Sequence, residues 1–200
     1  MAIPTFRFDD PPVPLDAPHP ATVAIDRERQ RLAAATARGV GMPIAGTLYW
    51  LGVAALLELL PLRTALFWSY VATGAVFPAG VLLTRAFGGD LFAKSERLTS
   101  LGLLMNAMQL FFWPMIIVTG YVAAPWTPFA MATLFASHFL GYAWLYRSRG
   151  YAVLAVGVPV ACLVAVVVAR DPLTATIPLL AAAVYAIASS LLLLEVRAGR

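Results

Sequence analysis

The sequence is short of the residues on which disulfide-stabilised domains and many soluble enzymes depend. Only 12% of its 200 residues are charged, about half the fraction of an average soluble domain. A single cysteine, Cys162, excludes an intramolecular disulfide and a metal cluster built from cysteines. Because Cys162 lies among valines and alanines, we expect it to be an inert packing residue.

Catalytic motifs are also missing. The sequence has no H-E-x-x-H pair, no G-x-S-x-G elbow and no P-loop. Acidic residues are nearly excluded from the apolar segments, so paired carboxylates for acid–base catalysis are not expected there. One histidine within those segments cannot hold a metal by itself. The sequence therefore favours a protein that is not an enzyme, with no catalytic residue, metal or cofactor expected.

Apolar residues are what the chain has in abundance. They make up 61% of the sequence, and the mean hydropathy is +0.81. Six apolar segments are each close to the roughly 20 residues that cross a bilayer core. They cover residues 41–60, 62–87, 98–122, 128–146, 151–169 and 173–196. Since the connections are short, residues 41–200 predict an all-α bundle of six antiparallel transmembrane helices.

The first 40 residues have a different composition. Residues 1–20 contain six prolines and several aspartates, which predicts a disordered tail without a secretory signal. Residues 21–40 are good helix formers that mix arginines with an apolar side, and they predict a leader helix. Two interpretations of this helix remain open: an interfacial helix on anionic headgroups, or a solvated extension of the first span.

The basic residues are distributed unevenly over the two sides of the predicted bundle. Of the 14, only Arg63 and Arg170 fall on one side, and the other twelve fall on the opposite side with both termini. Cytoplasmic segments of membrane proteins carry an excess of Lys and Arg. We therefore expect a multi-pass protein with both termini in the cytoplasm, which in a bacterium places it in the inner membrane. Because the basic residues sit at segment ends, a nucleic-acid partner is not expected.

Polar side chains inside the predicted spans are costly in lipid and therefore informative. Asn106 and Gln109 lie one turn apart on the third span, and His138 lies on the fourth. Counting from the cytoplasmic edge at 1.5 Å per residue places Asn106 and His138 roughly 11–13 Å deep, and Tyr49 reaches a similar depth. Tyr142 follows His138 at the i+4 position. These five residues predict a binding pocket, although interhelical hydrogen bonds that only hold helices together are the alternative.

Small residues at four-residue spacing mark two of the spans. On the fifth and sixth spans these are Gly157, Ala161, Ala165 and Ala169, and Ala182, Ala186 and Ser190. Such ridges let helix backbones approach closely. They predict tight packing against a neighbouring helix, or else the interface of a homodimer or of a larger membrane complex.

The fourth span also carries a recognisable pattern. His138-Phe139, Tyr142, Trp144-Leu145-Tyr146 and Tyr151, with Gln109 and Trp113-Pro114 upstream, resemble the signature of a small bacterial integral-membrane family of unknown function. The resemblance covers Leu98 to Tyr151, and the first 40 residues do not contribute to it. It implies the membrane topology but no mechanism. Gly141 stands where the family's pattern leads us to expect proline, so a straighter helix is expected here.

The first interpretation is a membrane protein that binds or passes a small or lipidic solute through a pocket on the cytoplasmic side. Its expected partners are the bilayer and such a ligand. A second interpretation is a structural or assembly subunit that uses the small-residue ridges. A third is an intramembrane enzyme in which His138 acts on a lipid, which the absence of a second catalytic group disfavours.

Overall fold

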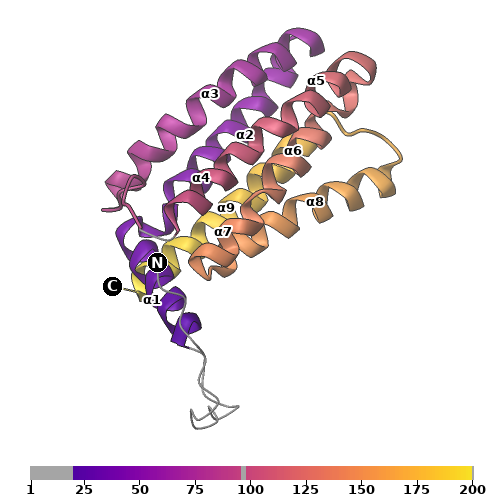
Figure 1. Cartoon of the computed structure of the whole chain (residues 1–200). Coiled ribbons are helices and arrows are strands. Elements are labelled where there is room, and N and C mark those ends of the chain that lie inside the picture. Colours follow the sequence, from indigo (N-terminus) through magenta and orange to yellow (C-terminus); the bar gives the residue numbers. More distant parts are fainter. Residues whose placement is uncertain (1–19, 96–97, 200) are drawn as a thin grey trace.

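The computed structural model describes residues 20–95 and 98–199, and every regular element in these ranges is a helix. The long helices lie side by side in one bundle, with α1 at one end (Figure 1). The elements are α1 (Pro20–Ala35), η1 (Ala37–Gly39), α2 (Gly41–Leu59), α3 (Leu62–Ala86), α4 (Thr99–Met108), η2 (Gln109–Phe112), α5 (Trp113–Val122), η3 (Ala124–Trp126), α6 (Thr127–Ser137), α7 (Phe139–Tyr146), α8 (Arg149–Ala169) and α9 (Thr176–Ala198). The predicted tail lies outside the described residues, apart from Pro20, which begins α1.

Five helices are long and apolar enough to cross a membrane. They run over Ala37–Leu59, Leu62–Ala86, Thr99–Val122, Arg149–Ala169 and Thr176–Ala198. Large apolar side chains cover their outward faces: Phe111 is 80% exposed and Val168 is 78% exposed. A soluble protein rarely exposes such a continuous apolar surface, whereas lipid solvates it. The fold is therefore that of a helical, multi-pass membrane protein.

The predicted span over residues 128–146 is divided in two. α6 ends at Ser137 and α7 begins at Phe139, so that His138 stands between them. The His138 backbone keeps right-handed helical angles (φ −65°, ψ −21°), and α7 continues from α6 along the bundle (Figure 1). Each part alone is shorter than a bilayer core requires.

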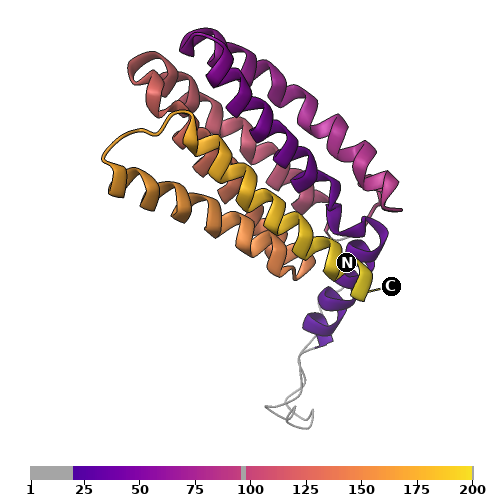
Figure 2. The same cartoon turned by 180° about the vertical axis from the view of Figure 1, so that it is seen from behind.

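α2 lies at the centre of the packing, with α3 on one side and α9 on the other. Figure 2 shows α9 running beside α2, with α8 next to α9. Two glycines of α2 allow this close approach: a Cβ at Gly41 would overlap the backbone of α3 at Gly80, and one at Gly46 would overlap the Tyr185 ring of α9. The small-residue ridge predicted on the fifth span lies on α8. It packs against α9 at Gly157, where a Cβ would lie 3.2 Å from Val184.

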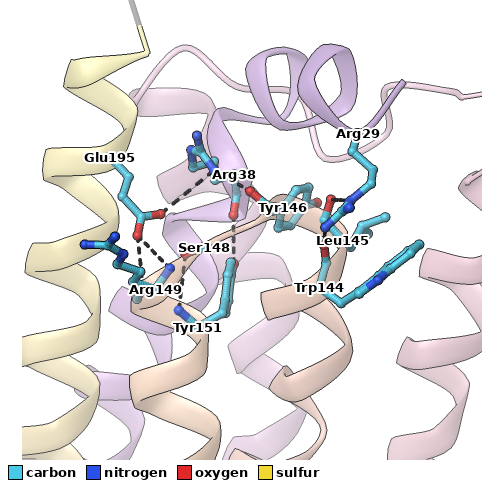
Figure 3. A network of polar contacts seen from close by, with 10 residues as sticks. Arg29, Arg38, Trp144, Leu145, Tyr146, Ser148, Arg149, Tyr151 and Glu195 are labelled. Carbon is cyan, nitrogen blue, oxygen red and sulfur yellow. Dashed lines mark hydrogen bonds and ion pairs between the residues drawn. The ribbon is translucent and has the colours of Figure 1, made fainter. Parts of the chain in front are cut away.

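One end of the bundle carries α1, the α3–α4 connection, the α7–α8 turn and the last turn of α9; we call it the basal end. Here α1 is joined to the last turn of α7 (Figure 3). Arg29 donates to the carbonyl oxygens of Trp144 and Leu145, and its guanidinium lies 4.4 Å from the Trp144 ring centroid. Arg38 donates to the carbonyl oxygen of Tyr146. Cations stabilise the end of a helix where carbonyls lack partners, so these contacts hold α7 against the leader segment.

Glu195 of α9 completes this network at the start of α8. Its Oε1 accepts hydrogen bonds from the backbone N–H groups of Arg149 and Gly150, at 2.8 and 3.1 Å. Its Oε2 lies 3.9 Å from Arg38. A carboxylate at a helix N-terminus satisfies N–H groups that have no partner within the helix. α1, α7, α8 and α9 therefore meet in one polar clasp, consisting of Arg29, Arg38 and Glu195 with their backbone partners.

The clasp yields a stability prediction. Replacing Glu195 with Ala leaves two backbone N–H groups and Arg38 without their carboxylate, a loss of about 1–3 kcal/mol. We expect the melting temperature of the detergent-solubilised protein to fall by several degrees. Glu58→Ala is the matched control, because Glu58 is exposed and no contact involving its carboxylate is found among the described residues. Equal melting temperatures for the two variants would show that the clasp does not stabilise the bundle.

Candidate functional site

His138 occupies the junction of α6 and α7, inside the bundle. Its Nδ1 lies 2.5 Å from the carbonyl oxygen of Phe135. Because a carbonyl can only accept, Nδ1 carries the proton and donates, which leaves Nε2 as an acceptor. No partner of Nε2 is found among the described residues. The imidazole therefore has one nitrogen available for a ligand.

Gln109, at the start of η2, is the polar side chain in contact with His138. Its amide nitrogen lies 3.5 Å from His138 Nδ1. A protonated Nδ1 cannot accept a hydrogen bond, so this contact becomes one only when the amide is turned with its oxygen toward the ring. At 3.5 Å the pair interacts weakly. Asn106, one turn earlier, lies in the same cavity wall as His138 but forms no hydrogen bond with it. Its amide has no partner among the described residues.

The two predicted tyrosines line the site, but their hydroxyls are directed to the backbone. Tyr49 on α2 donates to the carbonyl oxygen of Ser69 on α3, at 3.2 Å. Tyr142 on α7 donates to the carbonyl oxygen of Gly102 on α4, at 3.4 Å. Both side chains therefore join helices, and their rings form walls of the site. The structure brings the five predicted residues to one region, with His138, Asn106 and Gln109 as its polar lining.

Two adjoining cavities surround these residues. The basal cavity, about 350 Å³, lies toward α1, and the distal cavity, about 200 Å³, extends to Trp50 and Trp113. Both fall near or below the lower end of the range for small-molecule sites. They share five wall residues, which are Met42, Phe77, Asn106, His138 and Phe139. The free polar atoms of Asn106 and His138 therefore lie where the two cavities meet.

Aromatic rings of α7 and α8 form one wall of the basal cavity. Phe139 stacks on Tyr151 of α8, with ring centroids 5.6 Å apart, and Tyr142 stacks on Tyr146 at 6.1 Å. The Tyr151 hydroxyl lies 2.9 Å from the carbonyl oxygen of Arg38, so the stack also touches the clasp (Figure 3). Tyr185 of α9 packs edge-on against Phe139, at 6.0 Å. The stripe of His138, Tyr142 and Tyr146 was predictable from spacing.

Sequence reasoning missed other wall residues. Tyr185 contributes to the distal cavity, and Thr73 and Gly74 of α3 line its outer side. The signal for Tyr185 was present, since it is the one aromatic residue in the predicted span over residues 173–196. No comparable signal marks Gly74, because the sequence does not show which face of α3 is turned to α4.

The distal cavity reaches the outer surface between α3 and α4–η2. α3 packs mainly on α2, and the facing edges of the gap carry Phe77, which is 44% exposed, and Leu110, which is 68% exposed. A Cβ built at Gly74 meets no atom within 4 Å. The cavity is therefore accessible from the side of the bundle that faces lipid.

Nothing in the described residues forms a metal centre, since no group of three His, Cys, Asp or Glu side chains is close enough to hold an ion. Cys162 is buried on α8, away from both cavities. The chemistry available at the site is hydrogen bonding by one imidazole nitrogen and two amides, within an apolar and aromatic wall.

Comparison with known proteins finds one family. A family of unknown function (DUF7010) matches residues 25–195. No curated protein and no solved structure matches the chain. The match confirms the predicted membership of an uncharacterised family. It also extends well beyond Leu98 to Tyr151 and includes part of the first 40 residues, which were not expected to contribute.

A double-mutant cycle tests the geometry of the polar lining. We expect His138→Phe and Gln109→Leu to be coupled by about 0.6 kcal/mol, a typical value for polar pairs between membrane helices. His138→Phe and Asn106→Leu should be additive, because those two side chains share a wall without a hydrogen bond. The free energy of unfolding in mixed micelles measures both. A larger coupling with Asn106 than with Gln109 would contradict the described arrangement.

Proposed function

The chain belongs to the DUF7010 family, and because that family has no known function, we propose from the cavities that the protein binds or passes a small, mainly apolar solute of the membrane. The observation that carries the proposal is the pair of adjoining cavities, with Asn106 and His138 at their junction. The Asn106 amide and His138 Nε2 have no hydrogen-bond partner among the described residues. Polar groups left without partners in lipid are costly, and a ligand oxygen or hydroxyl would satisfy them.

The ligand's route follows from the side opening. A solute dissolved in the bilayer enters between α3 and α4–η2, past Gly74 and Leu110, and does not have to cross the bulk water phase. Lipidic solutes are concentrated in that environment, so the opening supports a lipidic ligand. The aromatic wall of Phe139, Tyr142 and Tyr151 offers the flat apolar surface on which such a molecule packs.

We further propose six spans with both termini in the cytoplasm of a bacterium. α6 and α7, together with His138, cover Thr127 to Tyr146, about 30 Å at 1.5 Å per residue, which is the thickness of a bilayer core. With this sixth crossing, the basal end and both termini lie on one side. That side carries twelve of the 14 basic residues, as the positive-inside rule requires of the cytoplasmic face. The site then lies on the cytoplasmic side of the midplane.

The topology has a direct test. Green fluorescent protein, which folds only in the cytoplasm, should fluoresce when fused after Arg200 and when inserted in the connection that follows Gly89. Alkaline phosphatase, which is active only outside, should be active after Ala124 and after Asp171. Phosphatase that remains inactive after Asp171 would contradict the proposed crossing by Thr127 to Tyr146, because a fusion after Ala124 precedes that crossing.

Ligand binding is tested with two glycine variants. Gly74→Leu places a side chain into the opening, whereas Gly52→Leu places the same side chain on an outward face of α2, where a Cβ likewise meets nothing within 4 Å. We expect native mass spectrometry of the purified wild type and of Gly52→Leu to show a co-purified lipid adduct, and Gly74→Leu to lose it. A wild type without any adduct, or an adduct retained by Gly74→Leu, would contradict a ligand entering by this route.

A further inference from the structure

Among the described residues, one cation lines the double cavity, at its basal mouth. Lys94, in the connection between α3 and α4, is the one charged side chain among the described residues that line the basal cavity. The distal cavity has no charged lining residue in the described part of the chain. Lys94 is exposed, and no hydrogen bond or ion pair of its ammonium group is found among the described residues.

Several of the described charged side chains at the basal end have partners of their own. Glu28 accepts a hydrogen bond from the Ser95 hydroxyl at 2.7 Å, and Asp90 accepts one from the Phe92 backbone N–H at 3.0 Å. Arg29 and Arg38 are held by the α7 carbonyls in the clasp (Figure 3). Neither acid lines the basal cavity or forms an ion pair with Lys94.

Beyond Lys94 the described wall residues are uncharged and mainly apolar over a considerable length. On the α4–η2–α5 segment the two cavities are lined from Leu98 to Trp113, which corresponds to about 22 Å at 1.5 Å per residue. One leaflet of a bilayer core is about 15 Å thick, so this length accommodates a full acyl chain. With about 350 and 200 Å³, the cavities suit one chain rather than the two chains of a phospholipid.

We propose that the ligand is a single-chain amphiphile with an anionic headgroup, bound with the headgroup at Lys94 and the chain directed past His138 toward Trp50. This rests on the proposed function and names its class of ligand. An ammonium group binds a carboxylate or a phosphate as a point charge, so both headgroups share the required chemistry. The apolar chain packs on Phe77, Phe92 and the aromatic wall.

The test compares ligands that share one chain. Tritiated hexadecanoate, hexadecyl phosphate and hexadecanol are bound to the full-length protein in detergent, in a scintillation proximity assay. We expect the wild type to bind at least one of the anionic ligands about tenfold more tightly than hexadecanol, the size of one charge-assisted hydrogen bond. Lys94→Gln should remove this preference and leave hexadecanol binding unchanged. The stronger of the two anions identifies the headgroup as a carboxylate or a phosphate.

Two control variants separate the position of Lys94 from net charge. Lys94→Arg should keep the preference for the anion. Arg27→Gln should also keep it, because Arg27 is exposed on α1 and lines neither cavity, although the same charge is lost.

The outcomes distinguish the two proposals. Equal binding of acid, phosphate and alcohol by the wild type, or an anion preference that survives Lys94→Gln, would overturn the anionic ligand while the cavity keeps its proposed function. If no chain binds to the wild type and Gly74→Leu changes nothing, both proposals are overturned.

Discussion

The structure depends on satisfying the backbone polar groups where helices end, because lipid offers them no partner. The clasp does this at the most demanding position, where α7 ends and α8 begins after a single turn. Arg29 and Arg38 cover the last carbonyls of α7, and Glu195 covers the first N–H groups of α8. The clasp thereby holds the end of α7, the helix that carries Phe139, Tyr142 and Tyr146.

The charged residues of the clasp lie next to the aromatic wall of the basal cavity. Tyr151 links the two, since its hydroxyl contacts the backbone of η1 and its ring stacks in the wall of the basal cavity. Rigid rings joined to the backbone keep their positions when no ligand is present, and shorter aliphatic chains would close the space more readily. The basal cavity therefore shares Tyr146 and Tyr151 with the contacts at the basal end.

The candidate site was predictable in part. Asn106, Gln109 and His138 stand out because polar side chains in apolar helices are rare, and the depth count placed Asn106 and His138 at one level. Their pairing was not predictable: His138 contacts Gln109 rather than Asn106, and the Tyr49 hydroxyl turns to Ser69. A depth count fixes height along the bundle, whereas hydrogen bonding also depends on the rotation of each helix about its axis.

The sequence alone determined the membrane class, the helical segments and the end of the bundle on which the basic residues gather. These features follow from composition and from local hydropathy, because each segment's length, apolarity and flanking charges decide whether and how it crosses a bilayer. Tertiary structure alone decided the break at His138, the clasp at Glu195, the opening beside Gly74 and the position of Lys94 at a cavity mouth. The last three join segments that are distant in the chain, so their geometry exists only after the helices have packed.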